Sequence, residues 1–195
     1  MDTTVANITF GAANEAAGIW LAVGTATVAN VVALLVVGLQ IRSSFDLLKA
    51  QRQMDVHERR LTEFYGPLLS LLRANGEIFR HAGPPAFPKE EGSKRRAAAS
   101  SWKIAKGKVL SNNVAIENVI LEKSHHLAPG DAIDAYMGLL VHVQMYQAFQ
   151  ERETDWYLQH FRFPPGIVDH VAKWHDSEKA AYLEAIGDAR KVLRK

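Results

Sequence analysis

The sequence contains no cysteine and no lysine or arginine before Arg42. Without cysteine, the chain cannot form a disulfide scaffold, a thiolate zinc site, an iron–sulfur cluster or a cysteine nucleophile. All 23 basic residues lie in 42–195, whereas Asp2 and Glu15 are the only charged residues before them. This asymmetry predicts an apolar N-terminal segment and a charged remainder that occupy different environments.

The N-terminal segment contains a long uncharged run. Residues 19–41 would form a helix about 35 Å long, against a hydrocarbon core of about 30 Å. A cleaved signal peptide is the main alternative, but it requires a basic start and a small-residue cleavage site, and this run ends at Gln40-Ile41-Arg42. We therefore predict one uncleaved transmembrane helix at 19–41.

Basic residues gather on one side of this run, and they set the predicted topology. Five follow it within twenty residues: Arg42, Lys49, Arg52, Arg59 and Arg60. The positive-inside rule then places the N-terminus outside and the rest of the chain in the cytoplasm. The predicted organisation is a short extracytoplasmic N-terminus (1–18), the transmembrane helix (19–41), a juxtamembrane helical neck (42–60) and a cytoplasmic helical bundle (61–195).

Small residues recur every fourth position in the outer half of the predicted span. Gly18, Ala22 and Ala26 form this strip, and Asn30 follows it near the middle of the bilayer. Such a strip lets another helix approach closely, and an asparagine can add a hydrogen bond across the contact. We interpret it as a packing surface for self-association or a different membrane protein; the alternative is that small residues are merely tolerated in the span.

The remainder of the chain is predicted to be all-α. Apolar residues recur at spacings of three and four over 42–81, 94–127, 131–160 and 167–192, and no segment alternates with a period of two. Pro67 predicts a kink near Tyr65-Gly66, and Asp131 is expected to cap the next helix. Short connections between about four helices predict an up-and-down bundle.

Several short stretches together resemble a loose group of uncharacterised bacterial, mostly membrane-anchored, helical proteins. The matching residues are Glu63-Phe64-Tyr65-Gly66-Pro67-Leu68, Asn75, Asn113, Ile116, Ile120, His126-Leu127, His142, Tyr146, Phe163-Pro164, Val168, His170 and Tyr182. The resemblance implies a helical cytoplasmic domain, and with the predicted span and topology we expect the chain in the bacterial inner membrane. The group has no established activity, so it assigns no catalytic residue. Gly66 departs from the group, whose members are often bulkier there.

No sequence motif indicates an enzyme, a metal centre or a cofactor site. His175-Asp176 is similar to the doublet of metal-dependent phosphohydrolases, but Asp188 and His170 lie on the same predicted helix and point in other directions. His125-His126 at a helix end is explained by the helix dipole. The chain has no glycine-rich phosphate loop, GxSxG or HExxH motif. We predict no catalytic residue, no metal ligand and no cofactor.

Polar residues set among apolar ones on successive helices form the most interesting candidate site. They are Asn75, Asn113, His126, His142 and Tyr146. If packing brings them to one level, they line a polar pocket. The alternative is that each makes a separate buried hydrogen bond or is partly exposed.

The strongest charge feature is a run of bases without an acid between 93 and 115. Its members are Lys94, Arg95, Arg96, Lys103, Lys106 and Lys108. With Arg42 they are candidate contacts for anionic lipid headgroups or for a partner protein. The alternative is an ordinary solvated surface, and nucleic acid is an unlikely partner because no reading motif accompanies the charges.

These observations predict a single-pass membrane protein that acts as a scaffold, auxiliary subunit or regulator through protein–protein contacts, and not as an enzyme. Two alternatives remain open. One is an effector that perturbs the membrane in a stress or phage-defence module, and the other is an enzyme that uses the polar pocket.

Overall fold

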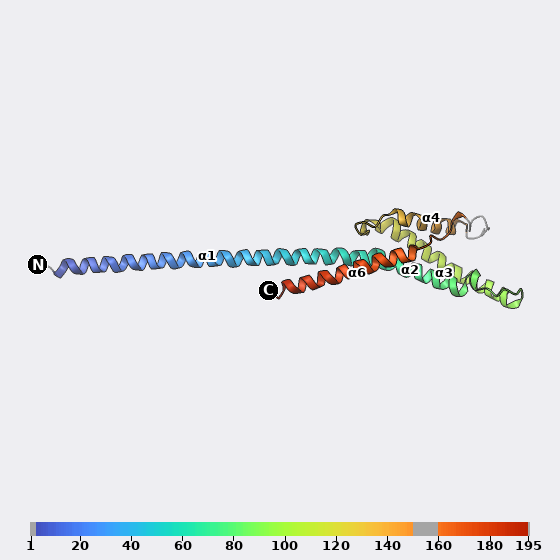
Figure 1. The fold of residues 1–195 in the computed structure, drawn as a ribbon, viewed down its shortest axis with the longest axis horizontal. Coiled ribbons are helices and arrows are strands. Elements are labelled where there is room, and N and C mark those ends of the chain that lie inside the picture. The colour runs from blue at the N-terminus through green and yellow to red at the C-terminus, as the bar shows by residue number, and fades with distance from the viewer. Residues whose placement is uncertain (1–2, 150–159, 195) are drawn as a thin grey trace. The chain divides into compact units, whose positions relative to one another are not determined.

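The computed structural model describes the backbone of residues 3–149 and 160–194, with side-chain environments from Thr27 onward (Figure 1). Every element in this part of the chain is helical and none is a strand, which confirms the predicted all-α class. The α-helices are α1 (Thr3–Arg59), α2 (Gly66–Ala82), α3 (Ser93–Lys123), α4 (Asp134–Ala148) and α6 (Ile167–Val192). Three shorter helices join them: η1 (Arg60–Tyr65), η2 (Pro84–Ala86) and η3 (Ser124–His126).

The chain divides into two compact units, and the first contains residues 1–50 and 189–195. Its main element is the greater part of α1, where every described side chain from Thr27 to Asp46 is exposed. By length and composition, this one helix is apolar enough to cross a membrane. The predicted packing residue Asn30 is exposed on it, whereas the side chains of Gly18, Ala22 and Ala26 lie outside the described residues.

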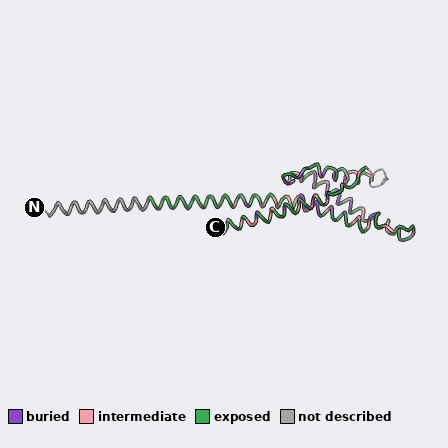
Figure 2. Tube along the Cα trace, viewed as in Figure 1, coloured by how far each residue is buried: buried purple, intermediate pink, exposed green. Residues whose placement is uncertain are grey.

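The second unit comprises residues 51–188 and contains the hydrophobic core. Helices α2, α3, α4 and α6 each bury one stripe in it, and Figure 2 shows the buried positions where these helices meet. Its largest fully buried side chains are Phe64, Tyr65, Leu68, Leu72, Ile116, Ile120, Tyr136 and Leu139. A second cluster contains Trp102, Val109 and Tyr146, with Phe79 packed against it. The apolar periodicity of the sequence thus produces one core and one satellite cluster.

The predicted kink before Pro67 takes the form of a π-helical turn. Helix α1 ends at Arg59, η1 is π-helical, and α2 begins at Gly66. The Gly66 N–H donates to the Leu61 carbonyl, five residues back, one residue before a proline that has no N–H to donate. The wider turn accommodates two consecutive aromatic residues, Phe64 and Tyr65, that are both fully buried.

Helix boundaries differ from the sequence prediction around 124–134 and at the end of α4. Asp131 does not cap the next helix, which begins three residues later at Asp134. The carboxylate of Asp131 instead accepts hydrogen bonds from other side chains in the core, so it is not available to backbone N–H groups. Helix α4 ends at Ala148, and the predicted continuation through 150–159 lies outside the described residues.

Gly66 is required by the π-helical turn, and a substitution tests this. A Cβ atom at this position would lie 2.5 Å from the Leu61 carbonyl oxygen. We expect Gly66→Ala to lower the free energy of unfolding by about 2 kcal/mol, because the backbone must shift to relieve the overlap. Urea denaturation of the full-length protein in detergent micelles, followed by circular dichroism, measures the loss.

Gly76→Ala in the same helix is the matched control. A Cβ atom at Gly76 meets nothing within 4 Å, so alanine should stabilise α2 by up to about 1 kcal/mol. Equal effects of the two substitutions would contradict the requirement for glycine at position 66.

Candidate functional site

A cavity of about 420 Å³ lies within the second unit. Its wall is formed by α2, α3, α4, the segment 161–163 and the start of α6. Four of the five predicted pocket residues line it, namely Asn75, Asn113, His142 and Tyr146. The periodicity of the three helices explains this grouping, because each residue interrupts the apolar stripe of its helix at a similar level.

The fifth predicted residue, His126, lies elsewhere. Its Nε2 atom is 3.3 Å from a carboxylate oxygen of Glu63, which also accepts a hydrogen bond from Lys123 at 3.4 Å. Desolvation raises the pKa of Glu63, but the hydrogen bond from Lys123 and the charges of both neighbours outweigh it and lower the pKa overall. His126 therefore belongs to a partly buried ion-pair group and not to the cavity.

Three buried asparagines form a hydrogen-bonded chain beside the cavity. The Nδ2 atom of Asn112 donates to Asn75 at 2.8 Å, and the Nδ2 atom of Asn75 donates to Asn113 at 2.9 Å. The chain ties α2 to α3, and it fixes the orientation of the two amides that line the cavity. Sequence reasoning missed Asn112, although the Asn112-Asn113 doublet within an apolar stripe was a usable signal.

His142 is held in one tautomer. Its Nδ1 atom lies 2.7 Å from the Phe161 carbonyl oxygen, which can only accept, so Nδ1 carries the hydrogen. Burial lowers the pKa of His142 more than this hydrogen bond raises it. The Phe163 ring packs edge-on against the imidazole at 5.4 Å. At neutral pH the ring is uncharged, and its Nε2 atom is an acceptor.

The lowered pKa of His142 predicts acid destabilisation. Below the unfolded-state pKa of about 6.5, the unfolded chain binds a proton at this position that the folded chain resists. The contribution of His142 should thus be complete above that pH and fall by at most about 1.4 kcal/mol per pH unit below it. Urea midpoints between about pH 7.5 and 5.5 measure this loss, and His142→Gln should make the profile shallower. If the dependence of stability on pH were the same in His142→Gln, the acid destabilisation would not arise from His142.

A second polar group surrounds Asp131, whose side chain is fully buried. The hydroxyls of Tyr65 and Tyr136 donate to its Oδ2 atom at 2.7 and 2.6 Å, and His170 Nε2 lies 2.8 Å from Oδ1. The Ala128 N–H donates to the Tyr65 hydroxyl at 2.9 Å. Burial raises the pKa of both tyrosines, and the nearby carboxylate adds to the effect. We call Asp131, Tyr65, Tyr136 and His170 the Asp131 cluster.

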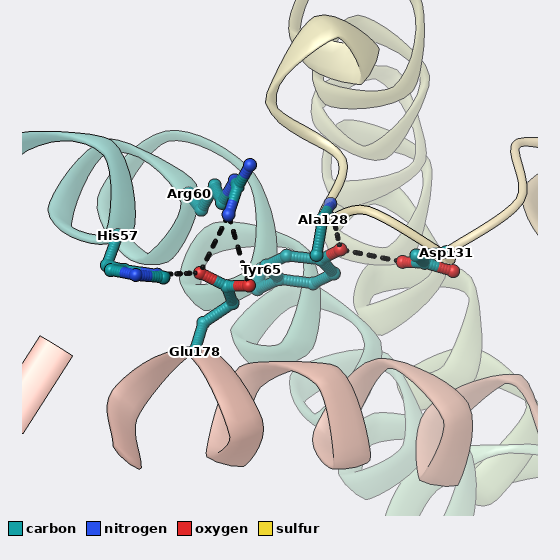
Figure 3. Close-up of polar contacts among 6 residues, drawn as sticks. All are labelled: His57, Arg60, Tyr65, Ala128, Asp131 and Glu178. Carbon is teal, nitrogen blue, oxygen red and sulfur yellow. Dashed lines mark hydrogen bonds and ion pairs between the residues drawn. The ribbon is translucent and has the colours of Figure 1, made fainter. Parts of the chain in front are cut away.

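A third group surrounds Glu178 on α6, which is only 5% exposed. His57 Nδ1 lies 2.6 Å from Glu178 Oε2, and Arg60 donates to both carboxylate oxygens at 3.4 and 3.5 Å. Figure 3 shows Tyr65 between Glu178 and Asp131, so this Glu178 cluster adjoins the Asp131 cluster. Both clusters join segments far apart in the sequence, and sequence reasoning missed them.

The predicted basic surface follows the first half of α3. Five of its six members on this helix are exposed, namely Lys94, Arg95, Arg96, Lys103 and Lys108. Lys106 differs, because it is partly buried and its ammonium lies 5.7 Å from the centre of the Tyr146 ring. Arg42 is exposed on α1 in the other unit. The five exposed residues lie along the first half of α3, where an acidic partner could contact them.

Metal-ligating side chains do not converge in the described part of the chain, where no three of them could hold an ion. His175 and Asp176 contact each other at 3.1 Å on the surface. Comparisons with protein-family models, curated protein sequences and solved structures found no match to this chain. In the described part of the chain, an amide chain and an uncharged imidazole lie beside an apolar cavity, an arrangement that can bind a molecule through hydrogen bonds and shape.

Proposed function

We propose that this chain is a single-pass protein of the bacterial inner membrane, with its N-terminus outside and its helical bundle in the cytoplasm. In this proposal the bundle acts as a scaffold, auxiliary subunit or regulator through contacts with other proteins. The observation that carries the membrane part is the uncovered apolar surface of α1. Leu34, Leu35 and Leu39 are 71, 62 and 68% exposed. Exposing this apolar surface to water is unfavourable, whereas the hydrocarbon of a bilayer would cover it.

The charge distribution supports the orientation. No charged side chain occurs between Thr27 and Ile41, and Arg42 is the first base of the chain. Arg42 is exposed, so its guanidinium can reach the headgroups at the inner face. Anionic lipids at that face would favour the basic residues that follow.

Association through the span is the second part of the proposal. Asn30 is an exposed amide on an apolar helix, and burying it in lipid without a partner is costly. A contact with another transmembrane helix would satisfy it, whether that helix belongs to a second copy or to a different protein. The basic surface on α3 would then be available to the cytoplasmic part of the partner.

Fractionation and a reporter test the membrane proposal. We expect the intact chain in the membrane fraction after an alkaline carbonate wash, and deletion of 19–41 should move the helical domain to the supernatant. Green fluorescent protein fused after Lys195 should fluoresce, whereas alkaline phosphatase at the same place should be inactive. An intact chain in the aqueous supernatant, or an active phosphatase fusion, would overturn the proposal.

Charge reversal tests the role of the basic surface. Lys94→Glu with Arg96→Glu should reduce the stoichiometric recovery of a co-purified protein by at least about fivefold. The matched control is Lys173→Glu with Lys179→Glu, which makes the same charge change on exposed positions of α6. Equal recovery from both double variants would assign the contact to another surface.

A further inference from the structure

The lining of the cavity includes a glycine that the helix itself does not require. Gly76 lies inside α2, where glycine costs about 1 kcal/mol relative to alanine. A Cβ atom there would meet nothing within 4 Å, so no close neighbour excludes a side chain. Gly76 lines the cavity, so a side chain at this position would border this space.

Two of the polar side chains that line the cavity use one polar atom for a hydrogen bond within the protein and have a second polar atom of the opposite character. Asn113 is 3% exposed, and its oxygen accepts from Asn75, so its Nδ2 atom is the donor that remains. His142 uses Nδ1 for the Phe161 carbonyl, which leaves Nε2 as an acceptor. These two atoms can therefore bind a ligand that offers both an acceptor and a donor.

The rest of the wall is apolar and aromatic. Phe79, Phe161 and Phe163 contribute rings, and no acidic residue lines the cavity in the described part of the chain. Arg162 is the one charged residue among the lining side chains described, and it is exposed to solvent. An amide and a neutral imidazole do not compensate a buried charge, so the interior favours an uncharged molecule. The volume of about 420 Å³ lies in the lower range for small-molecule sites.

We infer that this cavity binds a small, uncharged, flat aromatic molecule that carries a hydrogen-bond acceptor and a hydrogen-bond donor. The acceptor receives the Asn113 N–H, the donor binds His142 Nε2, and the rings lie among the phenylalanines. This inference does not depend on the membrane proposal, because the cavity lies within residues 51–188.

Three bicyclic probes separate the contributions of shape, hydrogen bonding and charge to binding. Carbostyril is an uncharged aromatic lactam whose carbonyl and N–H are adjacent, naphthalene has the same shape without polar atoms, and naphthoate adds a negative charge. Fluorinated forms of each are titrated against the full-length protein in lipid nanodiscs and followed by fluorine NMR, with empty nanodiscs as the background. We expect saturable binding of carbostyril, binding of naphthalene roughly tenfold weaker, and naphthoate weaker still.

Gly76→Phe tests the location of the site, because it places a large ring at a position that lines the cavity. We expect carbostyril binding to weaken by at least about tenfold. Gly107→Phe is the matched control, since Gly107 lies inside α3, a Cβ atom there would meet nothing within 4 Å, and the residue does not line the cavity. The affinity of Gly107→Phe for carbostyril should match that of the unaltered protein. Circular dichroism confirms that each variant is folded, and Gly76→Leu replaces Gly76→Phe if the larger ring prevents folding.

Four results would overturn the inference. They are no saturable carbostyril binding above the nanodisc background, equal affinity for naphthalene, tighter binding of naphthoate, and unchanged affinity in the folded Gly76 variant. The second would show an apolar cavity that does not recognise the polar pair, and the third would assign recognition to Arg162.

Discussion

Replacing Asp131 with alanine is expected to lower the free energy of unfolding by about 4 kcal/mol. The substitution removes a fully buried carboxylate that accepts hydrogen bonds from Tyr65 and Tyr136 and contacts His170. Hydrogen bonds to a charged group are worth about 1.5–3 kcal/mol each, and the two hydroxyls would lose their acceptor inside the core. Both rings are themselves fully buried, so water cannot replace the lost contacts without disturbing the packing.

Urea denaturation of the full-length protein in detergent micelles measures this effect, with Asp55→Ala as the control. Asp55 is an exposed carboxylate on α1 within the same compact unit, so its removal should change the unfolding free energy by less than about 0.5 kcal/mol. The loss of unfolding free energy in Asp131→Asn should lie between those of Asp131→Ala and Asp55→Ala, because asparagine keeps one carbonyl acceptor but loses the charge. A loss no larger than that of Asp55→Ala would show that the Asp131 cluster does not stabilise the fold.

The helices were predictable because their sequence signals are local. The last helix was expected at 167–192 and extends from Ile167 to Val192, since Phe163-Pro164-Pro165-Gly166 precedes an uninterrupted apolar stripe. A kink near Tyr65-Gly66 was expected from Pro67, but a π-helical turn depends on which side chains the core accepts. Propensity and periodicity do not contain that information.

The candidate cavity was predictable only in part. Asn75, Asn113, His142 and Tyr146 interrupt apolar stripes, which is a local signal, and all four line one cavity. His126 has a similar local pattern, but its imidazole contacts Glu63 and does not line the cavity. The identity of the neighbour across an interface depends on tertiary packing, so one sequence does not distinguish these cases.

The Asp131 and Glu178 clusters depend entirely on contacts between distant parts of the chain. Tyr65 and Asp131 are 66 residues apart, and His57 and Glu178 are 121 residues apart. The sequence nevertheless contained one signal for the Glu178 cluster. Glu178 occupies a position in the apolar stripe that contains Val171 and Ala185, at the spacing that predicts burial. A charged residue in such a stripe indicates a buried partner, although the sequence does not say which one.

Glu178→Ala is expected to lower the free energy of unfolding by about 3 kcal/mol. The carboxylate is buried between His57 and Arg60, and removing one member of a buried ionic group leaves the others desolvated without compensation. Arg60 keeps 16% of its side chain exposed and regains some hydration, so the loss should be smaller than for Asp131→Ala. Glu184→Ala is the control, because Glu184 is exposed on the same helix and its removal should have little effect.

A triple variant tests whether the ionic group of the Glu178 cluster stabilises the fold or only positions α6. His57→Leu, Arg60→Met and Glu178→Leu together replace the ionic group with apolar side chains of similar size. Buried ion pairs often contribute no more than such a replacement, so the triple variant should recover most of the loss seen in Glu178→Ala. Full recovery would mean that the carboxylate positions α6 against the end of α1 without being needed for stability. A triple variant as unstable as Glu178→Ala would instead show that the hydrogen bonds themselves stabilise this contact.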